Sequence, residues 1–240
     1  MKNWKDFSRL CERHFYTKGS TYAHALSLQL SKIIIFIAYN LKFTPNGLTV
    51  LSTIVIAIGM GFIVAKPTSL WFAMLNILCL QLGFMLDCAD GTLARLQNKN
   101  SLFGALLDPF LDRVNNFIVF IGFCVAWFFK SKGQISFSEL LIYVFSASAY
   151  ILYTVLSFMR GVIFKHLAGT MERFGRNGKE KLIKLPYQFM GMSMHFFILG
   201  VAYIFNAIFY AVLFYGILSS LMIIAMLFYL SQNEKAARMS

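Results

Sequence analysis

The sequence predicts an all-α integral membrane protein with six transmembrane helices and an N-terminal amphipathic helix at the membrane interface. The chain of 240 residues is 58% hydrophobic, with a mean hydropathy of +0.66, well above soluble domains. Apolar runs of about 20 residues, the length needed to cross the hydrocarbon core, recur along it. The candidate spans are residues 47–66, 69–90, 108–129, 138–159, 188–208 and 210–231. Such continuous runs favour helices over a β-barrel, and a soluble helical protein would lack a polar surface here.

Six crossings leave little room for a soluble domain, so we expect one membrane domain. It covers residues 47–232, after a cytoplasmic segment 1–46 and before a cytoplasmic tail 233–240. The first twenty residues carry charge throughout and have no apolar core, so we do not expect them to be a cleavable signal peptide. The four cysteines lack CxxC spacing and are expected to be small core residues without a disulfide or zinc.

The first expected element is a helix over about residues 25–42. Polar residues such as Lys32 interrupt its apolar run, which is too short to span a membrane. An apolar face opposite a lysine is typical of a helix lying in the interface. The alternative, a seventh short span, would move the N-terminus to the other side. After it, Pro45 and Asn46 favour a turn, and Thr44 or Asn46 can cap the next helix, whose N-terminus could also bind an anion.

The following elements are bounded by short polar segments. Lys66 and Pro67 end the first span, and the second runs to about Arg95. The polar turn 96–101 separates it from a third span that starts near Leu102. No tandem repeat is evident, so the sequence shows no sign of the internal symmetry common in transporters.

The net charge of +12 reflects membrane topology rather than nucleic-acid binding. If residues 1–46 face the cytoplasm, nineteen of the 22 lysines and arginines lie on that side. The other side holds Lys66, Lys130 and Lys132. This bias predicts, by the positive-inside rule, that both termini are cytoplasmic. The basic excess also attracts anionic lipid headgroups, and no nucleic-acid partner is expected.

Four of the ten acidic residues lie together beside long apolar stretches: Asp87, Asp90, Asp108 and Asp112. An ionised carboxylate at membrane depth is costly unless paired, so it marks a functional site. The first two share one helix face, the last two share a face of the next helix, and the short turn makes these helices antiparallel neighbours. Four carboxylates this close repel, and one or two hard divalent cations would resolve the conflict. Paired metals are also a recurrent solution for displacement at phosphorus. The alternative is that these aspartates only cap or bridge helices.

Small residues and one arginine accompany the aspartates. Glycine inside a helix, as at Gly91 and Gly104, usually serves close packing or ligand approach. Arg95 lies one turn beyond Gly91 and could bring positive charge to a phosphate, while Ala94 keeps that face small.

Together these residues form the pattern D-x2-D-G-x2-A-R-x8-G-x3-D-x3-D. Its fixed positions are Asp87, Asp90, Gly91, Ala94, Arg95, Gly104, Asp108 and Asp112. The pattern resembles the signature of the CDP-alcohol phosphotransferase family, also called CDP-alcohol phosphatidyltransferases. The six-span layout, the interfacial helix and the Pro45-Asn46-x2-Thr49 segment extend the resemblance to most of the chain.

The resemblance implies a reaction and a division of roles. Such enzymes cleave a CDP-linked donor, pass its phosphoryl-alcohol part to a hydroxyl and release CMP. Asp112 would be the general base and would also contact a metal. The ligands of one or two Mg²⁺ or Mn²⁺ ions would be Asp87, Asp90, Asp108 and Asp112. The residues of the CDP site would be Asn46, Thr49, Asp87, Asp90, Gly91, Ala94, Arg95 and Gly104. The resemblance also implies a homodimer.

The acceptor is expected to bind further along the chain. Residues 157–161 and 169–176 are similar to the phosphatidylinositol-type branch, in which basic residues bind a phosphorylated polyol. Val162 and Phe164 depart from that pattern, since the branch often has an arginine and an acid there. We expect an anion pocket for a phosphorylated or otherwise anionic acceptor, lined by Arg160, Arg173 and Arg176. The alternative is that these arginines only contribute cytoplasmic loop charge.

Two function classes are open to such a chain. The first is a membrane enzyme of phospholipid synthesis that uses CDP-diacylglycerol and a polar acceptor alcohol, or a soluble CDP-alcohol and a lipid acceptor. The second is a non-enzymatic metal transporter or channel, whose carboxylates would be spread along the membrane depth or form an oligomeric ring. Because the aspartates cluster at one face beside glycine and arginine, the sequence favours the enzyme.

Overall fold

A computed structural model describes residues 7–8, 11, 22–99, 101–171 and 192–238. Within those ranges the chain is helical, with turns between helices and no strand. The helices are α2 (Tyr22–Asn40), α3 (Pro45–Ala65), α4 (Leu70–Leu96), α5 (Leu102–Lys130), α6 (Phe137–Met171), α8 (Met192–Ile204) and α9 (Ile208–Arg238). The predicted all-α class is therefore confirmed for the described part.

Five of these helices are long and apolar enough to cross a membrane. They are α3, α4, α5, residues Phe137–Ser157 of α6 and residues Ile208–Phe228 of α9. They correspond to five of the six predicted spans. The predicted span 188–208 overlaps α8, a shorter apolar helix whose described part has 13 residues. The count of six crossings therefore stays a prediction.

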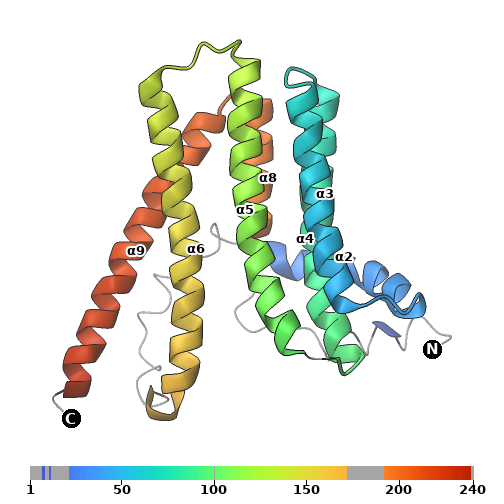
Figure 1. Ribbon diagram of the computed structural model, residues 1–240, viewed down its shortest axis with the longest axis vertical. Helices are drawn as coiled ribbons and strands as arrows, with labels where there is room; N and C mark the ends of the chain where they lie inside the picture. Colours follow the sequence, from blue (N-terminus) through green and yellow to red (C-terminus); the bar gives the residue numbers. More distant parts are fainter. Residues whose placement is uncertain (1–6, 9–10, 12–21, 100, 172–191, 239–240) are drawn as a thin grey trace.

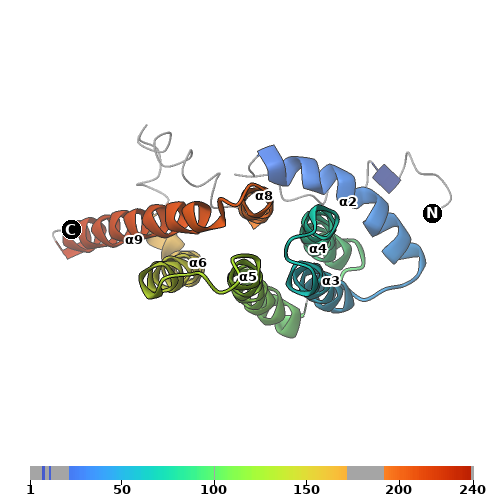
Figure 2. The same cartoon turned by 90° about the horizontal axis from the view of Figure 1, so that it is seen from above.

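The helices form two packing groups (Figure 1). In one group α3 packs along both α4 and α5, and α8 lies beside α4. In the other, α6 packs mainly against α9. The groups meet where α5 contacts α6 and α8 contacts α9. Seen from above, α3, α4, α5 and α8 are viewed almost end-on, whereas α2 runs across them (Figure 2).

Helix α2 has apolar side chains on its outer side. Ile33 and Ile37 are 57% and 52% exposed, while Lys32 is buried and its Nζ donates a hydrogen bond of 3.3 Å to Ser8 Oγ. A lysine on the face opposite the apolar residues was expected to face water, but Lys32 contacts Ser8 instead. The apolar outer side suits contact with lipid, and the placement of α2 in the interface stays a prediction.

Glycines allow α3 to approach two neighbours closely. A Cβ atom at Gly59 would lie 2.6 Å from Cys79 Cβ of α4, and one at Gly83 would lie 2.5 Å from Ile56 Cγ1 of α3. On α5, a Cβ atom at Gly122 would lie 2.6 Å from Met60 Cε. Small residues at helix contacts are the usual means of close packing in membranes, where the hydrophobic effect does not drive helices together. These contacts hold α3 between α4 and α5.

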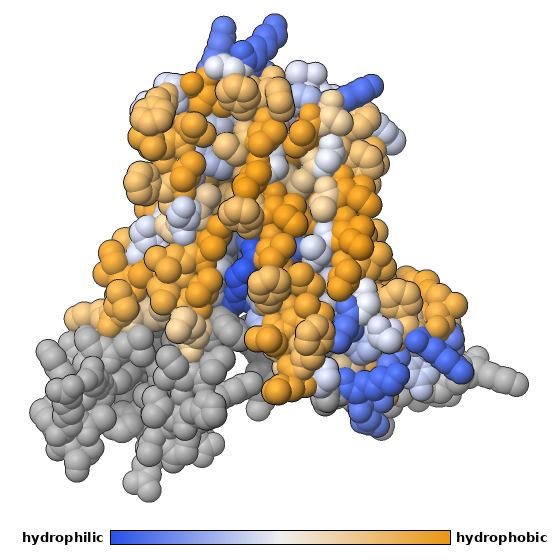
Figure 3. Space-filling view, viewed as in Figure 1, coloured by the Kyte–Doolittle hydropathy of each residue, from blue (hydrophilic) through white to orange (hydrophobic). Residues whose placement is uncertain are grey.

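Aromatic side chains fill the centre of the molecule and apolar ones cover its outside. The largest fully buried side chains include Tyr150, Tyr203, Tyr215, Phe123 and Phe196. Figure 3 shows an outer face made mostly of apolar side chains, as expected for helices in contact with lipid. About half-way down this face, hydrophilic atoms lie in a recess between the apolar ridges of α6 and α5 (Figure 3).

Candidate active site

The site is built where α4 ends and α5 begins. Ser101 caps α5, and its Oγ accepts a 2.9 Å hydrogen bond from Gly104 N. Thr44 caps α3 in the same way, accepting a 3.2 Å hydrogen bond from Gly47 N, which confirms one of the two predicted caps. Pro45 occupies the first turn of α3, where a missing N–H costs nothing. The polar turn between α4 and α5 therefore brings the last turns of α4 and the first turns of α5 to one end of the bundle.

Three of the four predicted aspartates come together there. One carboxylate oxygen from each of Asp87, Asp90 and Asp108 lies within 4.8 Å of the other two. Asp90 is buried, Asp87 is half-buried and Asp108 is exposed. Asp112 is not a member of this group, although it is close enough to interact electrostatically with Asp87 and Asp108.

The buried aspartate is held by a hydroxyl from α3. Thr49 Oγ1 donates a short hydrogen bond to Asp90 Oδ2 and also lies 3.2 Å from the Pro45 carbonyl oxygen of its own helix. Thr49 is itself buried. The structure therefore places Thr49 directly against one of the clustered carboxylates.

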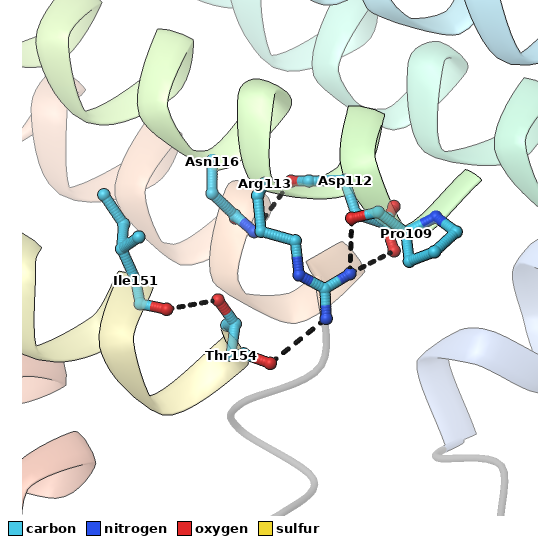
Figure 4. A network of polar contacts seen from close by, with 6 residues as sticks. All are labelled: Pro109, Asp112, Arg113, Asn116, Ile151 and Thr154. Carbon is cyan, nitrogen blue, oxygen red and sulfur yellow. Dashed lines mark hydrogen bonds and ion pairs between the residues drawn. The ribbon is translucent and has the colours of Figure 1, made fainter. Parts of the chain in front are cut away.

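Asp112 contacts an arginine instead (Figure 4). Arg113 Nη1 lies 3.5 Å from Asp112 Oδ2 and donates a 2.7 Å hydrogen bond to the Pro109 carbonyl oxygen. Its Nη2 donates a 3.1 Å hydrogen bond to the Thr154 carbonyl oxygen of α6. The other carboxylate oxygen, Asp112 Oδ1, is buried and has no hydrogen-bond partner among the described residues.

The predicted small residues lie beside polar groups of the site. A Cβ atom at Gly91 would lie 3.6 Å from Arg95 Nη1, so the guanidinium folds back over the glycine, with Nη2 donating to Thr92 Oγ1 at 3.2 Å. A Cβ atom at Gly104 would lie 2.9 Å from Asn46 Oδ1, so this glycine lets the start of α5 approach the start of α3. Ala94 is half-buried on the same helix as Arg95.

The residues present fit a hard divalent cation. Carboxylate oxygens are the ligands that Mg²⁺ and Mn²⁺ prefer, and two oxygens on opposite sides of a Mg²⁺ ion lie about 4 Å apart. The 4.8 Å limit among the three carboxylates is close to that spacing. Like charges this close repel in the absence of a cation. The unpartnered, buried Asp112 Oδ1 is a further oxygen beside the group.

The predicted acceptor residues lie at or beyond the edge of the described chain. Arg160 belongs to α6, but the orientation of its side chain is outside the described part. Arg173 and Arg176 are also outside the described residues. The anion pocket therefore stays a prediction.

The pattern of the CDP-alcohol phosphatidyltransferases matches residues 42–230. The chain belongs to this family. The match covers the candidate spans and the site, so the predicted resemblance is confirmed, as is the transferase class that it implied. The family and the five apolar helices together make the chain a multi-pass membrane protein.

Two curated relatives are similar to part of this chain. The bifunctional IPC transferase and DIPP synthase of Aquifex aeolicus is 43% identical over 76 residues, which cover 32% of this chain and 16% of the relative. The archaetidylinositol phosphate synthase of Pyrococcus horikoshii is 33% identical over 87 residues, covering 35% of this chain and 42% of the relative. The chain thus matches less than half of the length of either relative.

Sequence reasoning missed the polar residues that surround Asp112. In the sequence, Arg113 is only one of the basic residues on the predicted cytoplasmic side, and no pattern indicates a role for Asn116. In the structure, Asn116 Nδ2 donates a 3.0 Å hydrogen bond to the Asp112 carbonyl oxygen. A signal was available for Arg113, since an arginine within an apolar span is itself a functional-site indicator.

Proposed function

We propose that this protein transfers a phosphatidyl or other phospho-alcohol group from a CDP-linked donor to a hydroxyl acceptor and releases CMP. The observation that carries the proposal is the three-carboxylate group of Asp87, Asp90 and Asp108 at one end of an apolar helical bundle, with Asp112 one turn further along α5. Family membership supports head-group transfer of the phospholipid type.

The donor is proposed to be CDP-diacylglycerol. The site lies between helices whose outer surfaces are apolar, so a lipid-linked donor could keep its acyl chains in the bilayer while its nucleotide reaches the aspartates. Arg95 would add positive charge for a donor phosphate, and the glycines at 91 and 104 would let the nucleotide approach the backbone. Asn46, beside Gly104, is proposed to contact the cytidine side.

The proposed reaction is a displacement at phosphorus. The acceptor hydroxyl oxygen bonds to the phosphorus that carries the alcohol, the bond from that phosphorus to the bridging oxygen breaks, and CMP leaves with that oxygen. Asp112 Oδ1 would accept the hydroxyl proton, since this carboxylate oxygen has no hydrogen-bond partner among the described residues. Asp87, Asp90 and Asp108 would hold one or two Mg²⁺ or Mn²⁺ ions. When bound, such ions neutralise the pyrophosphate and the leaving group.

The acceptor is proposed to be a phosphorylated or otherwise anionic alcohol. One relative is named an archaetidylinositol phosphate synthase, and Arg160 lies on α6 beyond Thr154, which contacts the site through Arg113. Arg173 and Arg176 would complete the pocket. A homodimer remains a proposal from the family resemblance alone.

The orientation is proposed from charge. Lys99 lies in the turn between α4 and α5, at the end of the bundle that carries the aspartates. Lys130 and Lys132 lie at the opposite end of α5, where the sequence has few other basic residues. By the positive-inside rule the aspartates and both termini would be cytoplasmic.

The test is CMP release by the purified full-length protein with Mg²⁺ or Mn²⁺ and CDP-diacylglycerol. The acceptor panel is glycerol phosphate, serine, inositol and inositol phosphate. We expect release that requires both the metal and one anionic acceptor, and that is lost in Asp112→Asn, which keeps the shape of the side chain but cannot accept the proton.

Two outcomes would contradict parts of the proposal. Folded protein that releases CMP only from soluble CDP-alcohols with diacylglycerol would reverse the assignment of donor and acceptor. Folded protein that releases none from any donor, while still binding Mn²⁺, would overturn the transfer reaction.

A further inference from the structure

One arginine joins Asp112 to the second packing group of helices. The guanidinium of Arg113 donates to the Pro109 carbonyl oxygen at 2.7 Å and to the Thr154 carbonyl oxygen at 3.1 Å, and it lies 3.5 Å from Asp112 Oδ2. Its two terminal nitrogens therefore each hold a different helix, Nη1 on α5 and Nη2 on α6 (Figure 4). A planar guanidinium held at both amino groups has little freedom to rotate.

These contacts distinguish the two oxygens of Asp112. Oδ2 faces the guanidinium, whereas Oδ1 is buried without a hydrogen-bond partner among the described residues. Asn116 holds the backbone of the same residue, since its Nδ2 donates to the Asp112 carbonyl oxygen at 3.0 Å. One oxygen of the carboxylate is thus paired with the guanidinium, and the other has no hydrogen-bond partner in the described part of the chain.

The contact with Thr154 matters because α5 and α6 belong to different packing groups. Helix α5 packs mainly on α3, and α6 packs mainly on α9. Thr154 precedes Arg160 by six residues on α6, which is about 9 Å along a helix axis. Arg113 therefore connects the helix of the proposed base with the helix of a proposed acceptor residue.

We propose that Arg113 is a positioning residue that orients Asp112 for the acceptor hydroxyl and fixes its distance from α6. The inference rests on the proposed function, in which Asp112 is the base. A half-buried arginine in an apolar helix is favoured by a nearby opposite charge, and Asp112 supplies that charge. Lysine carries the same charge but has no fork that can reach two carbonyls in fixed directions.

The test compares wild type, Arg113→Gln and Arg113→Lys in the full-length protein with Mn²⁺, CDP-diacylglycerol and the acceptor that supports release. We expect Arg113→Gln to lower kcat about 100-fold, the effect of a small displacement of a reacting group, with the KM for the donor unchanged. Arg113→Lys should recover part of this loss. A matched control is Lys130→Gln at the other end of α5. Lys130 also connects two helices through a carbonyl group, because its Nζ donates a 2.8 Å hydrogen bond to the Tyr203 carbonyl oxygen of α8. This variant should change the Tm without changing kcat.

Several outcomes would overturn the role of Arg113 while leaving the proposed function in place. They are an Arg113→Gln enzyme with wild-type kcat, a Lys variant no more active than Gln, or a loss of kcat matched by a parallel rise in the donor KM. Absence of metal-dependent CMP release from folded wild type would instead overturn the proposed function, and the role of Arg113 with it.

Discussion

The contact between Thr49 and Asp90 suggests a more specific role for Thr49 than the sequence indicated. Its hydroxyl donates to Asp90, the most buried of the clustered aspartates. A buried carboxylate needs hydrogen-bond donors, and groups that hold a metal ligand commonly set both its direction and its affinity for the ion. Family resemblance suggested the cytidine side for Thr49, and its contact with Asp90 suggests that it orients a ligand.

Removing this hydroxyl should weaken metal binding. We expect Thr49→Val, which keeps the shape of the side chain, to lower the affinity for Mn²⁺ about 10- to 100-fold, and Thr49→Ser to stay near wild type. Isothermal titration calorimetry with Mn²⁺ measures this directly. Thr53→Val is the matched control, since Thr53 lies one turn along α3 and its hydroxyl donates to the Thr49 carbonyl oxygen at 3.4 Å, with no bond to a carboxylate among the described residues. Equal Mn²⁺ affinity in Thr49→Val and Thr53→Val would contradict the role.

The aspartates of the site could be predicted from sequence because their spacing fixes the helix face on which each lies. Asp87 and Asp90 had to share a face, and a short turn had to bring Asp108 near them. Spacing does not determine rotamers or contacts between distant segments. The bond from Arg113 to Thr154 joins residues 41 positions apart, and no local pattern indicates it.

At the scale of helices, α3 is the element around which the site is assembled. Thr49 of α3 donates a hydrogen bond to Asp90 on α4, and Asn46 of α3 lies beside Gly104 on α5. Helix α3 also packs on both of these helices. Helix bounds followed from apolar runs and caps, so α3, α4 and α5 lie close to their predicted positions. Burial of Lys32 on α2 could not be predicted, because its partner Ser8 lies 24 residues earlier in the chain.

The close approach of α3 to α4 depends on Gly59. A methyl group there would lie 2.6 Å from Cys79 Cβ, so Gly59→Ala should force the helices apart and lower stability by about 1–3 kcal/mol. Gly61, two residues along the same helix, has nothing within 4 Å of an added Cβ. Gly61→Ala should therefore leave the Tm unchanged or raise it, since alanine favours helix by about 1 kcal/mol. Thermal unfolding in detergent compares the two variants, and equal midpoints would contradict this account of the packing.

At the scale of the whole molecule, we expect the three-carboxylate group of Asp87, Asp90 and Asp108 to couple metal binding to stability. Three carboxylates that share a small volume repel one another, so an ion bound there stabilises the folded chain. At a Mn²⁺ concentration 100 times the Kd, mass action alone contributes about 2.7 kcal/mol. We expect Mn²⁺ to raise the Tm, EDTA to reverse the effect, and Asp90→Asn to abolish it. A shift of equal size in Asp90→Asn would mean that the ion acts elsewhere.

The orientation of the molecule determines which substrates can reach the site, and it can be tested at two exposed positions. Lys99 lies in the turn beside the aspartates, and Gln134 lies in the turn between α5 and α6 at the opposite end of α5. In a background with the four cysteines replaced by alanine, Lys99→Cys and Gln134→Cys each place one thiol at a known end of α5. The predicted topology puts nineteen of 22 basic residues on the side of the aspartates, so a membrane-impermeant maleimide should label Gln134→Cys in intact cells and Lys99→Cys only after permeabilisation. The reverse pattern would place the aspartates outside the cytoplasm, where CDP-linked donors would have to be supplied by a separate export step.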